Sequence, residues 1–246
     1  MSEWSGHEPG APCWAELSST DVTLSVRFYR EVFGWEAVFD PRPGSGGRGR
    51  FTLDGRVVAG VGPGDGLSCA WNTYVAVADA AAAAARSRAA GGAVVLEPAP
   101  VLDEGVAATV RDSAGACLTL WQAVRHAGAE VVGEPGTLAW SELVTGETAV
   151  REDFFYRAVF DWTVKDAGGY GWWCLRGRPV AGLTGPEPLA HWRSCFAVSR
   201  VDAAVARAVE LGARVLAPPS MTPQGIRAVL ADPQSAVFGL VEAARG

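Results

Sequence analysis

Two glutamates in a repeated, tryptophan-containing phrase are the strongest candidates for proton transfer. Glu16 lies two positions after Trp14, and Glu142 lies two positions after Trp140. Because side chains alternate along a strand, each glutamate shares a face with its tryptophan. A carboxyl group held in an apolar cleft can act as a general base. The alternative is a structural ion pair, for which Arg193 is the candidate partner of Glu16.

A second group of reactive side chains lies near residue 193. His191, Arg193 and Cys195 occupy alternate positions and therefore share one face of a predicted strand. A thiol beside an imidazole is a candidate nucleophile, and a buried, unreactive thiol is the alternative. The chain has five cysteines, and their odd number without CxxC spacing argues against a disulfide framework or a zinc knot. Reduced thiols and the lack of a visible signal peptide predict a cytoplasmic protein.

Composition excludes several classes of function. The chain of 246 residues has a net charge of −6 and no basic run, which argues against nucleic-acid binding. No apolar run approaches the roughly 18 residues of a membrane span. The glycine-rich stretch at 43–49 lacks the lysine and hydroxyl residue of a phosphate-binding loop, so we predict a hairpin loop there, with a lid over the first cleft as an alternative.

The elements that must position these residues occur twice along the chain. Three phrases of the first half recur in order in the second half, pairing residues 14–35 with 140–162, 55–60 with 177–182, and 112–116 with 232–236. A period of roughly 120 residues indicates a tandem duplication. We predict domains at residues 1–126 and 137–246, joined by a linker at 127–136.

Each copy divides again into two modules with the order strand, helix and three strands. In the first module, an alternating strand at 12–18 precedes a helix that begins after Asp21 and ends at Gly34. Three short strands follow, and the same pattern restarts at 71–77. Four βαβββ modules predict an α+β fold in which curved sheets wrap clefts and helices cover the outside.

The modules, the WxEL…FYxxxFxW phrase, the GRxVAG hairpins and the closing DxxxA turns together resemble the vicinal oxygen chelate superfamily. This superfamily includes glyoxalase I, bleomycin-resistance proteins and extradiol dioxygenases. The resemblance is closest to tandem glyoxalase-like proteins of actinobacteria and covers roughly residues 12–243. It implies incomplete barrels made from paired modules, each with a ligand cleft.

Most enzymes of this superfamily hold a divalent metal through His, Gln or Glu, and the resemblance implies where those ligands would lie. The corresponding positions hold Trp14, Trp140, Asn72, Arg193, Thr119 and Gly239. None of these offers the imidazole or carboxylate that such ions need. We therefore expect no bound metal and no other cofactor. This expectation argues against glyoxalase, dioxygenase and epoxide-opening chemistry.

Aromatic side chains are expected to line the clefts instead. With Trp14 and Trp140 at the ligand positions, the alternation places Asn72 beside Tyr74 and Thr119 beside Trp121 on cleft-facing sides. Such walls suit planar or conjugated ligands. The alternative is that Trp14 and Trp140 plug the empty metal sites.

Three functions remain open at this point. The first is a metal-independent isomerase, cyclase or lyase acting on a conjugated, natural-product-like small molecule, with a glutamate moving the proton. The second is a non-catalytic protein that sequesters an antibiotic or metabolite, as bleomycin-resistance proteins do. The third is a metal-dependent lyase or dioxygenase. In each case we expect a small-molecule ligand and a monomer that is a pseudo-dimer, or a homodimer.

The pairing of modules decides which residues share a cleft. In dimeric relatives with short chains, the first module of one subunit shares a cleft with the second module of the other. A fused chain would then pair its first module with its fourth, and Glu16 would meet His191, Arg193 and Cys195. On this pairing we expect the first cleft to be the functional one. If each copy closes on itself, Glu16 meets Asn72, Tyr74 and Thr119.

Overall fold

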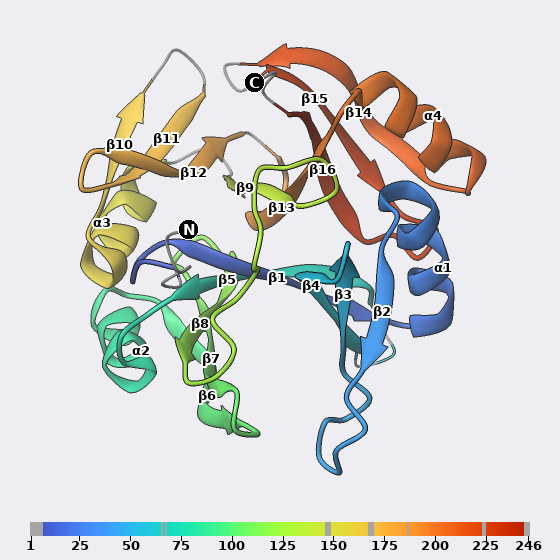
Figure 1. Ribbon diagram of the computed structural model, residues 1–246. Coiled ribbons are helices and arrows are strands. Elements are labelled where there is room, and N and C mark those ends of the chain that lie inside the picture. The colour runs from blue at the N-terminus through green and yellow to red at the C-terminus, as the bar shows by residue number, and fades with distance from the viewer. Residues whose placement is uncertain are drawn as a thin grey trace, which may run out of the picture. The chain divides into compact units, whose positions relative to one another are not determined.

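A computed structural model describes residues 7–64, 66, 68–145, 149–166, 170–185, 187–222 and 225–243. These residues form four βαβββ modules in sequence (Figure 1). The first two modules consist of β1 (Pro12–Ser19), α1 (Val22–Phe33), β2 (Glu36–Phe39), β3 (Gly49–Leu53), β4 (Arg56–Pro63), β5 (Ala70–Ala76), α2 (Ala80–Ala89), β6 (Ala93–Val101), β7 (Gly105–Arg111) and β8 (Cys117–Ala123). The last two consist of β9 (Leu138–Val144), α3 (Ala149–Phe160), β10 (Trp162–Asp166), β11 (Gly171–Leu175), β12 (Arg178–Thr184), β13 (His191–Val198), α4 (Val201–Glu210), β14 (Arg214–Thr222), β15 (Gly225–Ala231) and β16 (Val237–Glu242).

The strands form two eight-stranded mixed sheets, which confirms the predicted α+β architecture of tandem modules. Their orders are β2-β3-β4-β1-β5-β8-β7-β6 and β10-β11-β12-β9-β13-β16-β15-β14. In every module the first strand pairs in parallel with the last, as β1 does with β4 and β9 with β12. The other neighbours within a module pair antiparallel.

Helix α1 begins and ends where the sequence predicts. The side chain of Asp21 accepts a hydrogen bond from the backbone N–H of Leu24, which caps the N-terminus of α1. Gly34 ends this helix in the left-handed conformation, with φ 77°, where a side chain would be strained. Asp79 caps α2 in the same way, through the N–H of Ala82.

The chain packs into two compact units, each of which combines modules from both copies of the duplication. The first–fourth unit contains Trp14–Trp71, Ala129–Trp140 and Arg193–Gly246. The second–third unit contains Met1–Cys13, Asn72–Gly128 and Ser141–Trp192. The ranges 1–126 and 137–246 therefore describe the duplication, whereas the compact units describe the packing.

Aromatic side chains dominate the core of the first–fourth unit. The helices α1 and α4 lie side by side there (Figure 1). Tyr29, Trp35 and Phe51 are fully buried between α1 and the strands. The indole N–H of Trp35 donates to the carbonyl of Gly136 at 2.7 Å, so this polar group is satisfied inside the core.

The second–third unit repeats this packing with α2 and α3. Trp162 and Trp173 are fully buried in its core, and the indole N–H of Trp162 donates to the carbonyl of Gly10 at 2.7 Å. Gly92, after the end of α2, faces Phe155 so closely that a Cβ atom would lie 2.4 Å from its ring. A glycine at this position therefore allows the segment after α2 to approach α3.

A chain of three buried side chains is built identically in both units. In the first–fourth unit the indole of Trp71 donates to the hydroxyl of Tyr29 at 2.8 Å, and this hydroxyl donates to Asp232 at 3.0 Å. Burial and the charge of Asp232 raise the pKa of Tyr29 well above its ordinary value, so the phenol stays a neutral donor. In the second–third unit the chain consists of Trp192, Tyr156 and Asp112. The repeated aromatic and DxxxA motifs are thus structural.

Candidate functional site

Strand β1 presents Trp14 and Glu16 on the face away from its helix. Ala15 and Leu17 are buried in the core that α1 covers. Since side chains alternate, Trp14, Glu16 and Ser18 occupy the opposite face. Trp14 is only 4% exposed, so its indole is almost fully covered.

Gly60 on β4 provides the floor beneath these two side chains. It pairs directly with Glu16 across the parallel β1–β4 ladder. A Cβ atom on Gly60 would lie 2.8 Å from Cγ of Glu16 and 3.0 Å from Nε1 of Trp14. The last residue of the GRxVAG phrase must therefore be glycine, because the carboxyl group of Glu16 and the indole of Trp14 lie directly over its backbone.

The carboxylate of Glu16 forms an ion pair with Arg48. Nε of Arg48 lies 3.4 Å from Oε1 of Glu16, whose side chain is 19% exposed. The stem of Arg48 crosses Gly62, where a Cβ atom would lie 2.9 Å from its Cγ. Arg50 on β3 faces the same side, because it pairs with Gly60. The ion pair that the structure shows for Glu16 thus involves Arg48, while the pairing with Arg193 stays a prediction.

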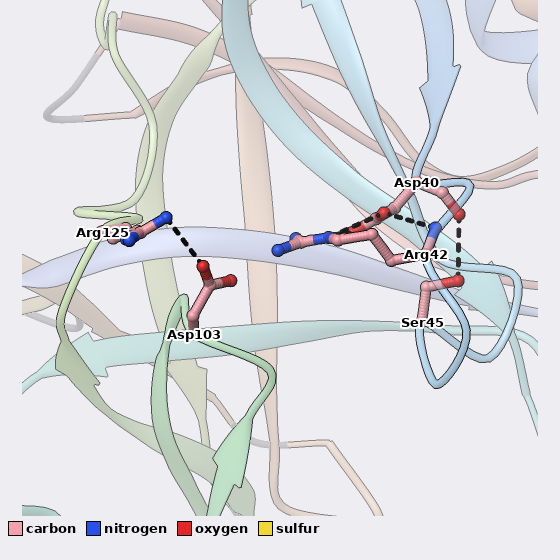
Figure 2. A network of polar contacts seen from close by, with 5 residues as sticks. All are labelled: Asp40, Arg42, Ser45, Asp103 and Arg125. Atoms are coloured by element: carbon pink, nitrogen blue, oxygen red, sulfur yellow. Dashed lines mark hydrogen bonds and ion pairs between the residues drawn. The ribbon is translucent and has the colours of Figure 1, made fainter.

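The glycine-rich segment that carries Arg48 is a closed hairpin loop. The backbone N–H of Asp40 donates to the carbonyl of Arg48 at 3.0 Å, and the N–H of Arg48 donates to that of Ser45 at 3.2 Å. Figure 2 shows the side chains of Arg42 and Ser45 directed at Asp40. The guanidinium of Arg42 lies 2.7 Å from the Asp40 carboxylate. These bonds with Arg42 lower the pKa of Asp40 to about 2.

A separate ion pair lies in the second–third unit, where the guanidinium of Arg125 is 2.8 Å from the carboxylate of Asp103. Figure 2 shows this pair as well.

Glu142 occupies the equivalent position in the second copy, with different neighbours. It pairs with Gly182 on β12, as Glu16 pairs with Gly60. Its side chain is fully buried, and the phenol of Tyr170 donates to its Oε1 at 3.0 Å. Trp172 on β11 pairs with Gly182 and therefore shares the face of Glu142. The rings of Tyr170 and Trp172 contact each other, with centroids 5.7 Å apart.

Strands β5 and β8 carry a third set of predicted residues. Tyr74 pairs with Thr119. The rings of Tyr74 and Trp121 pack edge to face, with their centroids 6.1 Å apart. The indole N–H of Trp121 donates to the carbonyl of His126 at 2.8 Å, which fixes the ring. Asn72 shares the face of Tyr74 by alternation, so the structure brings these four predicted residues onto one surface.

Arg193 and Cys195 lie on one face of β13, opposite the core residue Phe196. Both are buried, and Cys195 pairs with Gly239 on β16. A Cβ atom on Gly239 would lie 2.4 Å from Sγ of Cys195, so the sulfur fills the space over this glycine.

The remaining predicted residues, His191 and Trp140, are partly exposed at the starts of their strands. The ring of His191 contacts its own preceding loop, with Nδ1 3.0 Å from the carbonyl of Leu189 and Nε2 3.9 Å from Glu187. Trp140 lies two positions before Glu142 on β9 and therefore faces the same side.

Side chains at the positions implied for metal ligands do not fit a divalent ion. The indole of Trp14 lies against Gly60, and Cys195 fills the space over Gly239. Thr119 stands beside Tyr74 with a hydroxyl rather than a carboxylate. Among the residues that the structure describes, no three His, Cys, Asp or Glu side chains come close enough together to hold an ion.

Four functional candidates escaped the sequence analysis: Arg48, Arg50, Tyr170 and Trp172. For Arg50 and Trp172 the signal was the last glycine of each GRxVAG phrase, since these two residues pair with Gly60 and Gly182. In each copy, three paired residues lie side by side across neighbouring strands. They are Arg50, Gly60 and Glu16 in the first copy. They are Trp172, Gly182 and Glu142 in the second.

Tandem βαβββ modules whose carboxylates face away from the helices define a glyoxalase-like protein. The family described as the Glyoxalase/Bleomycin resistance protein/Dioxygenase superfamily matches residues 14–120, and the family described as a Glyoxalase-like domain matches residues 140–241. The chain therefore belongs to the glyoxalase/bleomycin resistance/dioxygenase superfamily.

Two of the relatives that this chain matches are named as anthracycline biosynthesis proteins. The chain is 40% identical to the anthracycline biosynthesis protein DnrV of Streptomyces peucetius, over 97% of this chain and 95% of that protein. It is also 40% identical to the anthracycline biosynthesis protein DauV of Streptomyces sp. (strain C5), over 95% and 94%.

Solved structures show the same fold. The Mn(II)-bound glyoxalase from Novosphingobium aromaticivorans superposes with a TM-score of 0.67 at 16% identity, over 96% of this chain and 83% of that one.

No helix among the described residues is both long and apolar enough to span a membrane.

Proposed function

We propose that the protein binds a planar, polycyclic aromatic metabolite of a secondary pathway and carries out metal-independent acid–base chemistry on it. Isomerisation, cyclisation and elimination are the reaction types that proton transfer alone supports. The observation that carries the proposal is the carboxyl group over a glycine, beside aromatic rings, on the strand face of the second copy. The likeness to anthracycline biosynthesis proteins supports the class of substrate.

Pairs of aromatic side chains on the strands support a planar ligand. Tyr74 and Trp121 form one contacting pair, and Tyr170 and Trp172 form another. Stacking on such rings contributes about 0.5–1.5 kcal/mol for each aromatic pair, beyond the burial of apolar area. A fused, conjugated ring system offers the flat surface that several rings can contact at once.

The chemistry of the donor set supports metal independence. A divalent ion in this fold would need imidazole or carboxylate donors where the chain has Trp14, Thr119 and Gly239. The acids and phenols of the strand faces serve proton transfer directly and need no Lewis acid.

A fluorescence titration tests the proposal. Dihydroxyanthraquinone is the planar probe and cyclohexanone the non-planar control. We expect the anthraquinone to quench tryptophan fluorescence saturably and cyclohexanone to leave it unchanged. Trp14→Ala and Trp140→Ala should weaken binding of the anthraquinone strongly, and each variant should remain folded with only a small fall in melting temperature. A wild-type protein that fails to bind the anthraquinone contradicts the proposal, and two variants that simply unfold identify both tryptophans as structural plugs.

Sequestration without catalysis is the second candidate, favoured by one observation in the first copy. There the carboxylate of Glu16 is already held by the guanidinium of Arg48 at 3.4 Å, which reduces its availability as a base. Mass spectrometry of the bound metabolite after incubation separates the two functions: a catalyst returns an isomer or product, and a sequestering protein returns the ligand unchanged.

A further inference from the structure

The glycine-rich loop of the first copy ends at an arginine whose guanidinium group extends onto the strand face that carries Trp14 and Glu16. Resting on the proposed function, we propose that Arg48 binds an ionised carboxylate group of the ligand. The inference names a substrate class that the proposed function leaves open, namely an aromatic polycycle that carries a carboxylate. Glu16 then competes with the ligand for the same guanidinium group.

The backbone of Arg48 is fixed on both sides. Its N–H donates to the carbonyl of Ser45 at 3.2 Å, and its carbonyl accepts from the N–H of Asp40 at 3.0 Å. The hydroxyl of Ser45 also donates to the carbonyl of Asp40, at 3.0 Å, which closes the base of the loop. Arg48 therefore starts from a defined position, and less freedom is lost when its side chain binds a ligand.

Glycine at position 62 lets the stem of Arg48 lie against strand β4. A Cβ atom on Gly62 would lie 2.9 Å from Cγ of Arg48 and 3.7 Å from its Cβ. Across the parallel β1–β4 ladder, Gly62 pairs with Ser18 and Gly60 pairs with Glu16. Because neither glycine has a side chain, the arginine stem crosses bare backbone on its way to Glu16.

The guanidinium group of Arg48 has donors to spare. Its Nε lies 3.4 Å from Oε1 of Glu16, which is longer than a typical N–H···O hydrogen bond. Among the residues that the structure describes, none forms a hydrogen bond or ion pair with Nη1 or Nη2 of Arg48. These nitrogens present N–H groups in one plane, the arrangement that matches both oxygens of a carboxylate. The side chain is 55% exposed, so a ligand can reach it.

The second copy presents aromatic rings at the positions of the first-copy arginines. Tyr170 stands immediately before β11, as Arg48 stands immediately before β3. Trp172 pairs with the last glycine of its GRxVAG phrase, as Arg50 does in the first copy. The common backbone register therefore carries guanidinium groups in one copy and rings in the other. This contrast suits the first copy to an anionic group and the second to an uncharged aromatic surface.

A comparison of a charged and an uncharged probe tests the inference. Anthraquinone-2-carboxylate is the anionic probe, and anthraquinone-2-carboxamide is the uncharged probe of similar size and flatness. We expect the wild type to bind the carboxylate about tenfold more tightly, and added salt to narrow the difference. The net charge of −6 opposes the binding of an anion, so a preference for the carboxylate requires a local cation.

Substitutions at Arg48 identify that cation. Arg48→Gln should reduce the affinity for the carboxylate about tenfold and leave the affinity for the carboxamide unchanged. Arg48→Lys should restore only part of the preference, because an ammonium group lacks the planar pair of donors. The matched control is Arg27→Gln, which removes the same charge from an exposed position on α1 and should change neither affinity. Melting temperatures should stay at the wild-type value in all three.

A substitution of the competing carboxylate should act in the opposite direction. Glu16→Gln removes the negative charge that shares the guanidinium group, so the affinity for anthraquinone-2-carboxylate should rise several-fold. The affinity for the carboxamide should stay constant. A purely structural ion pair between Glu16 and Arg48 predicts no gain for the carboxylate, and that result would overturn the inference.

The remaining outcomes separate this inference from the proposed function. If neither probe binds the wild type, the proposed function is wrong and the inference falls with it. If both probes bind with equal affinity, or if Arg48→Gln keeps the preference for the carboxylate, only the assignment to Arg48 is wrong. Should Arg48→Gln fail to fold, the partial preference expected of Arg48→Lys and the gain expected of Glu16→Gln decide in its place.

Discussion

The hydroxyl of Tyr156 donates a 2.8 Å hydrogen bond to Asp112, which joins the third module to the second inside one compact unit. The same hydroxyl accepts from the indole of Trp192 at 2.9 Å. Oδ1 of Asp112 meanwhile accepts the backbone N–H groups that close its own turn, from Ala114 to Ala116. One phenol thus connects a helix, a turn and a strand.

Removal of this hydroxyl should destabilise the protein without affecting ligand recognition. Tyr156→Phe leaves a buried carboxylate and a buried indole N–H each short of a partner, at a cost of about 1–3 kcal/mol. Chemical denaturation followed by tryptophan fluorescence measures the loss. The matched control is Phe154→Leu on the same helix, because Phe154 is 63% exposed and should change stability little. Equal stability of Tyr156→Phe and wild type would show that the hydrogen-bonded chain contributes nothing net.

The sequence predicts the modules well because their signals are local. Asp21 and Gly34 bound α1 where the capping pattern places them, and alternation identifies the face of β1 that carries Glu16. Edge strands are predicted less well. Strand β6 continues through Pro98 to Val101, although a proline usually argues against a strand. Proline is tolerated there because β6 is the outermost strand of its sheet.

Arg50 and Trp172, which share the faces of the glutamates, escape prediction because a β-bulge sets the register of each hairpin. Between Phe51 and Thr52 the β3–β4 ladder shifts by one residue, and the shift brings Arg50 opposite Gly60. The corresponding shift between Trp173 and Cys174 brings Trp172 opposite Gly182. Counting back from a hairpin turn without these bulges aligns the wrong residues.

Acid titration should reveal the charge pair that holds the glycine-rich loop. The hydrogen bonds and charge of Arg42 lower the pKa of Asp40 from 3.8 to about 2. A lowered pKa means that the ionised carboxylate stabilises the loop fully above about pH 4 and that this contribution is lost as the pH falls towards 2. Carboxyl NMR shifts of Asp40 measured against pH should give the low midpoint directly.

Two variants check the cause of that shift. Arg42→Ala should raise the midpoint of Asp40 towards 3.8. Arg125→Ala, which removes the partner of Asp103 instead, should leave the midpoint of Asp40 where it was. A midpoint near 3.8 in the wild-type protein would contradict the ion pair in solution.

Elemental analysis should find no stoichiometric divalent metal in the purified protein. The reason is chemical: indole, hydroxyl and bare glycine positions replace the imidazole and carboxylate donors that such ions require. Ligand binding should accordingly survive dialysis against a chelator. About one manganese, iron, nickel or zinc ion per chain, together with loss of function on chelation, would show that ligands exist elsewhere in the chain.

A methyl group at Gly60 should disturb the first-copy carboxylate specifically. The added Cβ atom would lie 2.8 Å from Cγ of Glu16, 3.0 Å from Nε1 of Trp14 and 3.1 Å from Oε2 of Glu16. Overpacking of this kind costs about 1–3 kcal/mol, so Gly60→Ala should lower the denaturation midpoint. Since two of these three contacts belong to Glu16, the double variant with Glu16→Ala should cost less than the sum of the single changes. Strictly additive costs in the double-mutant cycle would mean that the carboxylate does not lie over Gly60 in solution.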